Sequence, residues 1–315
     1  MTLGLASAEL TCRRERRPST SHHETSRACA SLDRDEYIEQ AYFFRVYRER
    51  VEENQPAQEV LATARDELLA TTRLPMAIDF LSGEMQLHGR IGEGMAKLGH
   101  YFSPFQAYIM QRAEADTGRF ETRMALRILE AEAEYRADEV SPQALFMYQF
   151  ECLARNHLGY DQGLRAIAAD GKYNEDWRTW IDGLRRSLGV TDFARLVYGR
   201  SQHRADELRR QGAADQDLQQ LPKPLFGSQE GRIAKAHYDK DPLYLFAALQ
   251  RHLGYPRVPR VATRANRPTF DPQVEMRFQR LESRLALLES EAKGGIDLSE
   301  FYAKEGRREL DQNAD

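Results

Sequence analysis

The chain has 315 residues, of which 41% are hydrophobic and 30% are charged, and its net charge is -4. This length suffices for about two domains with a core of normal size. The balanced charge argues against a protein that binds polyanions over its whole surface, and no apolar run approaches the ~20 residues that a membrane-spanning helix needs.

The three cysteines, Cys12, Cys29 and Cys152, are far apart, and no CxxC pair occurs. We therefore expect neither a zinc site nor a disulfide framework, but a reduced, cytoplasmic protein with Cys152 buried. Residues 1–32 are rich in Ser, Thr and Arg, and their arginines follow the short apolar stretch instead of preceding it. This order is wrong for a secretory signal and predicts a disordered tail, with a transit peptide as the alternative.

Residues 33–254 predict a helical body. Tyr37, Ala41 and Phe44 give the first helix a wide aromatic face, which is typical of a helix packed on more than one neighbour. Alternating apolar and polar runs between hairpin turns are almost absent, so we predict an all-α protein, built as a multi-helix bundle or helical array. Further helices are expected at about 56–71, 76–81, 90–98, 104–117, 119–137, 142–158, 175–188, 192–210 and 242–253.

The ends of these helices carry recognisable signals. Four Ser-Pro or Asp-Pro pairs place a capping side chain before a proline at the first helical position. Four Leu-Gly pairs are predicted to stop helices, because glycine adopts the left-handed conformation easily. Two of them belong to a repeated "HLGY", which we interpret as paired stop signals, with a diverged helical duplication as the alternative. The predicted starts are Ser103, Ser141, Asp241 and Asp271, and the predicted stops are Gly99, Gly159, Gly189 and Gly254.

The C-terminal part is predicted to be modular. A long connection occupies about 210–231, and a basic, proline-containing linker occupies 255–270. Residues 271–293 follow as an amphipathic helix, either a coiled coil or a helix docked on its own domain. Residues 294–315 then form a hinge and a short helix. The self-association seam comprises Val274, Phe278, Leu281, Leu285 and Leu288.

Two further surfaces are predicted in this part. Residues 242–270 contain no Asp or Glu, so their arginines could contact RNA or an anionic membrane surface, or acidic patches of the body. Residues 296–302 combine a capping box with a hydrophobic staple, which predicts a short helix that docks in a groove of a partner or of the protein itself. The arginines are Arg251, Arg257, Arg260, Arg264 and Arg267, and the docking residues are Ile296, Leu298, Phe301 and Tyr302.

No catalytic or metal-binding motif is recognisable, so no cofactor is expected. The glycine-rich stretch 88–100 resembles a phosphate-binding loop only faintly, and the Glu130, Glu132 and Glu134 carboxylates are expected to face water. We predict a non-catalytic interaction or assembly protein that acts through its C-terminal helix and tail, with a protein partner or a second copy. The alternative is an enzyme with a polar site inside the bundle, for which the candidates are Glu84, His88, Lys97 and His100.

Overall fold

The structure is a computed structural model that describes residues 32–115, 120–212 and 221–260, together with Leu281 and Leu285. The chain divides into two compact units between Arg260 and Val261. Within the described residues there are thirteen bounded helices and no β-strand, which confirms the all-α class.

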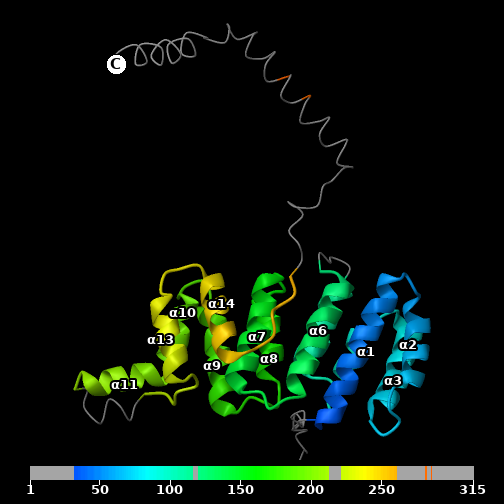
Figure 1. Ribbon diagram of the computed structural model, residues 1–315, viewed down its shortest axis with the longest axis horizontal. Helices are drawn as coiled ribbons and strands as arrows, with labels where there is room; N and C mark the ends of the chain where they lie inside the picture. Colours follow the sequence, from blue (N-terminus) through cyan, green and yellow to red (C-terminus); the bar gives the residue numbers. More distant parts are fainter. Residues whose placement is uncertain (1–31, 116–119, 213–220, 261–280, 282–284, 286–315) are drawn as a thin grey trace, which may run out of the picture. The chain divides into compact units, whose positions relative to one another are not determined.

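All thirteen helices belong to the first unit (Figure 1). They are α1 (Arg34–Glu52), α2 (Ala57–Glu67), α3 (Leu74–His88), α4 (Gly92–Lys97), α5 (Pro104–Ala113), α6 (Thr122–Arg136), α7 (Pro142–Arg155), α8 (Tyr160–Ala168), α9 (Glu175–Ser187), α10 (Phe193–Gly199), α11 (Gln202–Arg210), α13 (Ser228–Ala236) and α14 (Pro242–Leu253).

The predicted capping residues begin three of these helices. Ser103 caps α5 in a reciprocal capping box with Gln106, and Pro104 occupies the first turn. Ser141 accepts a hydrogen bond from the Ala144 amide at the start of α7. Asp241 accepts one from the Leu243 amide at the start of α14. These starts could be predicted because each depends on two adjacent residues. The predicted start at Asp271 lies outside the described residues.

The predicted stops are only half right. Gly254 has a left-handed φ of 72° directly after α14, and Gly189 has a φ of 87° one residue beyond Leu188, the extended cap of α9. Gly99 has no positive φ, and Gly159 precedes α8 instead of ending α7. Helix α7 ends earlier because His157 takes the left-handed conformation, and the Leu158 amide then donates to the Leu153 carbonyl at 3.1 Å.

The first unit is an array of helices that lie side by side, with α2 and α3 near one end and α11 and α13 near the other (Figure 1). Helix α1 packs against α6, and α7 packs against α8 and α14. Ten consecutive residues of α7, from Ala144 to Leu153, are buried, so this helix lies in the core. Phe146 contacts Trp177 and Trp180 of α9 within this core.

Several elements differ from the predicted ones. The single helix expected at 192–210 is broken at Arg200–Ser201, because Ser201 caps a new helix and forms an isolated bridge with Phe226. That bridge also explains why part of the predicted 210–231 connection is ordered: Leu225 and Phe226 are buried and helix α13 begins at Ser228. Helix α8 was not predicted, since its nine residues are too few to show a clear period.

Candidate functional site

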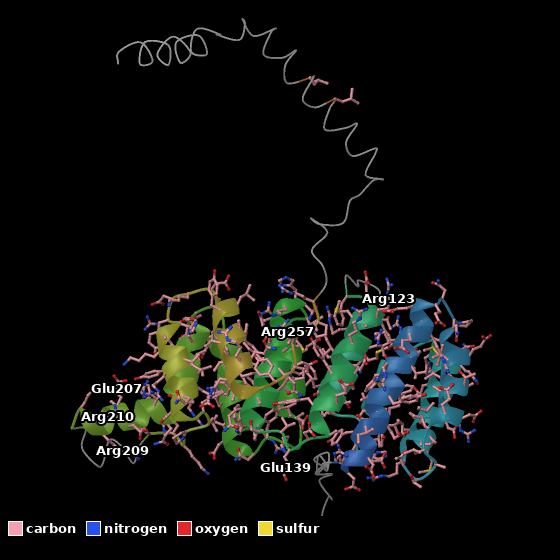
Figure 2. The ribbon with its side chains drawn as sticks, viewed as in Figure 1. Arg123, Glu139, Glu207, Arg209, Arg210 and Arg257 are labelled. Carbon is pink, nitrogen blue, oxygen red and sulfur yellow. The ribbon has the colours of Figure 1, made fainter. Side chains whose placement is uncertain are left out.

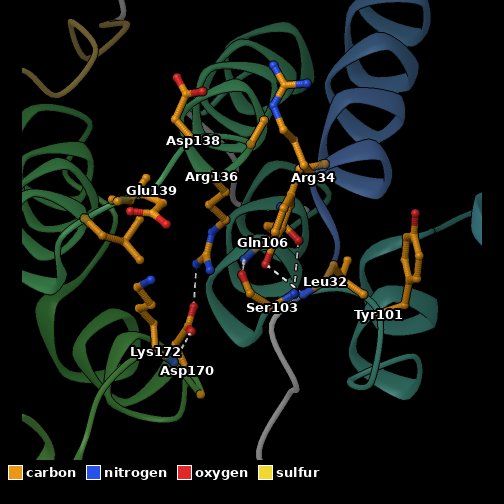
Figure 3. Close-up of a pocket in the computed structure, with 15 residues that line it drawn as sticks. Leu32, Arg34, Tyr101, Ser103, Gln106, Arg136, Asp138, Glu139, Asp170 and Lys172 are labelled. Atoms are coloured by element: carbon orange, nitrogen blue, oxygen red, sulfur yellow. Dashed lines mark hydrogen bonds and ion pairs between the residues drawn. The ribbon is translucent and has the colours of Figure 1, made fainter.

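A pocket of about 440 Å³ opens among the N-termini of α1 and α5, the C-terminus of α6 and the turn between α8 and α9 (Figure 3). This volume is within the range of small-molecule sites in proteins. The pocket brings together segments that are more than 100 residues apart in sequence. Its charged and hydroxyl-bearing lining residues are Arg34, Tyr37, Tyr101, Ser103, Arg136, Asp138, Glu139, Asp170 and Lys172.

A buried ion-pair network forms one wall of this pocket. Arg136, in the last turn of α6, donates to Oε1 of Glu132 through Nε at 3.2 Å and Nη2 at 2.9 Å, and also donates to Asp170. Glu132 is fully buried, so the expectation that it faces water is wrong. Burial raises the pKa of Glu132, although Arg136 and Gln149 partly oppose that shift.

The network continues away from the pocket into the core. Gln149 of α7 donates to Glu132 at 2.7 Å and accepts a hydrogen bond from the Tyr173 hydroxyl at 2.8 Å. The Oε2 atom of Glu132 is buried and has no hydrogen-bond partner among the described residues. Burial acts to lower the pKa of Arg136, but Asp170 and Glu132 outweigh it and hold that pKa above its usual value. Arg136 therefore remains charged and bound to two carboxylates.

The rim of the pocket carries charges of both signs. The side chains of Arg34, Lys172, Asp138 and Glu139 line it, and none has a hydrogen bond or ion pair within the part of the chain that the structure describes (Figure 3). No histidine or cysteine lines the pocket, and Asp170 is already bonded to Arg136. The arrangement offers paired charges for binding a polar ligand, and no side chain is placed as a nucleophile beside a general base.

The four residues considered for an enzyme site lie elsewhere, on α3 and near α4. Glu84 and Lys97 form an ion pair with an Nζ–Oε2 distance of 2.7 Å. His88 and His100 are exposed, and neither has a hydrogen-bond partner among the described residues. None of the four lines the pocket. Glu84 and Lys97 are therefore paired with each other, and neither histidine side chain belongs to that pair.

The glycine-rich stretch holds an anion from within the chain. The Glu114 carboxylate accepts hydrogen bonds from the Ile91 amide at 2.7 Å and the Gly92 amide at 2.8 Å. A Cβ atom on Gly92 would lie 2.7 Å from the backbone nitrogen of Gln111, so this glycine allows α4 and α5 to approach closely. The amides that a phosphate would need are thus occupied by a side chain.

Only two residues of the predicted self-association seam are described. Leu281 and Leu285 are helical, and they are 57% and 58% exposed. Val274, Phe278 and Leu288 lie outside the described residues, as do the docking residues Ile296, Leu298, Phe301 and Tyr302.

The arginine-rich segment begins with residues that pack on the body. Arg251, Arg257 and Arg260 are exposed, and Figure 2 marks Arg257. Between them Tyr255 is only 2% exposed, and its hydroxyl donates to Glu151 of α7 at 2.7 Å. The side-chain amide of Asn156 donates to the Pro259 carbonyl at 3.0 Å. Residues 255–260, called the strap below, are outside any helix and are fixed to the end of α7. Arg264 and Arg267 lie outside the described residues.

The outer face of α3 is a surface that sequence reasoning missed. Met76, Phe80 and Leu87 are 67%, 38% and 76% exposed, although the opposite face of the same helix is buried. The signal was present in "PMAIDFLSGEMQLH", which is apolar on both sides of a helical projection. We refer to Met76, Phe80, Gly83 and Leu87 as the α3 stripe.

A metal cluster and a membrane-spanning helix are both absent from the described ranges. In these residues no group of three or more His, Cys, Asp or Glu side chains is placed to hold a metal ion. None of the helices described is long and apolar enough to cross a membrane. Cys152 is free and buried, as the sequence predicts, and burial raises its pKa.

Comparison with known protein families, with curated proteins and with solved structures finds no match.

Proposed function

We propose that this chain is a non-catalytic protein-interaction or assembly protein. Its helical array acts as a rigid body, and the helix that contains Leu281 and Leu285 makes the contact. The observation that supports this is the exposure of the two leucines, which are four residues apart in sequence, both helical, and 57% and 58% exposed. They occupy successive positions of the predicted heptad seam, and two such seams bury their apolar side chains when they pair. A cytoplasmic location is part of this proposal.

Light scattering on the full chain tests the self-association. We expect an oligomer at micromolar concentration, and Leu281→Glu with Leu285→Glu should convert it to a smaller species, because four charges would enter the seam of a dimer. Ser283→Glu with Ser290→Glu, off the predicted seam, adds the same charge and should leave the oligomer intact. An unchanged mass for both variants would rule out pairing through this seam.

The tail is proposed as the second contact, through Ile296, Leu298, Phe301 and Tyr302. Deletion of residues 294–315 distinguishes docking on a partner protein from docking on the same chain. Loss of a co-purifying partner with an unchanged melting temperature supports a partner protein. A lower melting temperature with no partner lost shows that the tail docks on its own chain.

The enzyme alternative draws its support from the pocket beside Arg136, which is lined in part by charged residues and is large enough for a small molecule. Native mass spectrometry of protein purified from its own cells tests it. A small ligand retained by the wild type and lost by Lys172→Ala would favour that alternative. If no ligand is retained, the result favours the interaction function over the enzyme alternative.

The polyanion alternative relies on Arg251, Arg257 and Arg260, which are exposed on a segment with no acidic residue. Titration with RNA and with anionic vesicles at two salt concentrations tests it. Binding that weakens steeply with salt would support phosphate contacts. If neither titration shows binding at low salt, both forms of this alternative are excluded.

A further inference from the structure

Helix α3 is apolar on both faces, and only one of them is covered. Leu74, Ile78 and Leu81 of the inner face are fully buried against the array. Met76 and Leu87 of the outer face are 67% and 76% exposed. Helices that are apolar all round are normally covered all round. Among the described helices α3 packs mainly against α1, α2 and α4, and the exposure of Met76 and Leu87 shows that none of these covers its outer face.

The α3 stripe is symmetric in its spacing. Its four residues follow one another at intervals of 4, 3 and 4, so its midpoint falls between Leu81 and Ser82. If two copies of α3 meet antiparallel about a two-fold axis at that midpoint, Met76 of one copy lies opposite Leu87 of the other. The Phe80 ring then lies beside Gly83 of the second copy, where a Cβ would meet nothing within 4 Å. A large side chain would thus fill the space left by a missing one.

We propose that the α3 stripe is a homodimer interface, occupied by the same stripe of a second copy. The charges beside it are compatible with burial. Asp79, on one side, is paired with Arg65 at 2.7 Å. Glu84, on the other side, is paired with Lys97 at 2.7 Å. An isologous contact would therefore bury no unpaired carboxylate, which is the costly case in interfaces.

The exposed area indicates that this interface would be small. The stripe and its exposed neighbours Asp79 and Gln86 offer roughly 500 Å² per copy, or about 1,000 Å² in total, which is the lower limit of specific interfaces. We therefore expect a dimer with a dissociation constant in the micromolar range. This interface is independent of the C-terminal helix, so the two contacts can be separated by mutation.

The experiment uses the full chain with Leu281→Glu and Leu285→Glu, which disables the C-terminal seam. Sedimentation equilibrium up to about 100 µM should still show a dimer, because an interface of this size is within reach of micromolar affinity. Adding Met76→Glu and Leu87→Glu should raise the dissociation constant at least about 100-fold, since charges would enter the centre of the contact. Gln211→Glu with Val190→Glu, two exposed sites of which Gln211 follows α11 at the other end of the array, is the control and should leave the dimer unchanged.

Cross-linking tests the two-fold axis itself. In a chain with Cys12→Ser and Cys29→Ser, Gly83→Cys lies near the axis and should give a covalent dimer with a short bis-maleimide, because packed helix axes are about 8–10 Å apart, beyond the reach of a disulfide. Val190→Cys, at a site that is 89% exposed, should not. Circular dichroism checks that each variant remains folded. A monomeric background protein at 100 µM, a dimer that survives Met76→Glu with Leu87→Glu, or no cross-link through Cys at position 83 would overturn the proposal.

Discussion

The burial of Glu132 could have been predicted from spacing within its own helix. It follows Ala125, Ile128 and Leu129 at intervals of seven, four and three, which places it on the buried side of α6. Glu130 and Glu134 lie on other sides, and Glu130 pairs with Arg48 at 3.2 Å. The three glutamates were treated as one acidic cluster, although residues two apart in a helix point in different directions. The second carboxylate bound to Arg136, that of Asp170, could not be predicted, because it lies in the turn between α8 and α9.

Gly92 illustrates a residue whose role is steric. We expect Gly92→Ala to destabilise the protein by about 1–3 kcal/mol, the usual effect of overpacking, because the added carbon meets backbone that cannot move alone. Gly183→Ala is the matched control, since a Cβ there meets nothing within 4 Å. In the interior of α9 that change should be neutral or stabilising by about 0.5–1 kcal/mol. Urea denaturation measures both, and equal effects would contradict the steric explanation.

Glu114 gives a pH dependence with a definite sign. Burial raises its pKa, although the Ile91 and Gly92 amides partly oppose that shift. A carboxyl whose folded pKa is above its unfolded pKa binds protons more readily in the folded state. Its contribution to stability is therefore greatest below the unfolded pKa and decreases as the pH rises through the folded pKa.

The free energy of unfolding of Glu114→Gln should consequently rise relative to that of the wild type as the pH increases from about 4 to about 7. This holds whether the variant is more or less stable than the wild type at any one pH. Glu134→Gln, on the exposed side of α6, serves as the control variant. Denaturation at several pH values provides the measurement. A difference between wild type and Glu114→Gln that is constant with pH, or that changes in the opposite direction, would contradict the assignment.

At the scale of elements, starts were easier to predict than stops. A Ser-Pro pair carries both the capping oxygen and the fixed φ, so α5 and α7 begin where the sequence indicates. The end of α7 depends on tertiary contacts as well. Tyr108 of α5 donates to the Leu158 carbonyl and to the Gly159 carbonyl, and this fixes the turn after α7. A pattern confined to "HLGY" cannot contain that contact.

The capping box of α5 makes the third prediction. Ser103→Ala should lower the free energy of unfolding by about 1 kcal/mol, because the Gln106 amide loses its acceptor. Asp33→Ala removes an N-cap residue that makes no side-chain cap hydrogen bond in α1, and should cost less than about 0.5 kcal/mol. Thermal denaturation compares the two, and a larger effect for Asp33→Ala would reverse the argument.

At the scale of the whole molecule, the all-α class was predictable and the pocket was not. Helical periodicity is local, whereas the pocket joins Leu32 to Lys172 and other residues that are far apart in the sequence. The contacts of the strap could not be predicted either. Prolines and arginines in residues 255–260 indicate an extended segment but not the surface on which it packs. The aromatic residue directly after Gly254 was the one available sign, and Tyr255 does pack back on the body.

The strap makes the fourth prediction. Tyr255→Phe should reduce stability by about 1–3 kcal/mol, because it leaves an oxygen of the buried Glu151 carboxylate without its donor. Trypsin should also cleave faster after Arg257 and Arg260 in this variant. Tyr244→Phe, at an exposed site on α14, should change neither the denaturation midpoint nor the cleavage rate. Unchanged proteolysis of Tyr255→Phe would show that the hydroxyl does not hold the strap.

The strap also determines how the first unit responds to a pull on whatever follows residue 260. Tension on the chain reaches Pro259 and Tyr255 first, and these are fastened to Asn156 and Glu151 at the end of α7. The load is therefore transferred to the innermost helix before α14 can be peeled away. Before α14 can open, the Pro259 contact and then the Tyr255 contact must both be broken. A tether that joins this protein to another body would thus be anchored in the core.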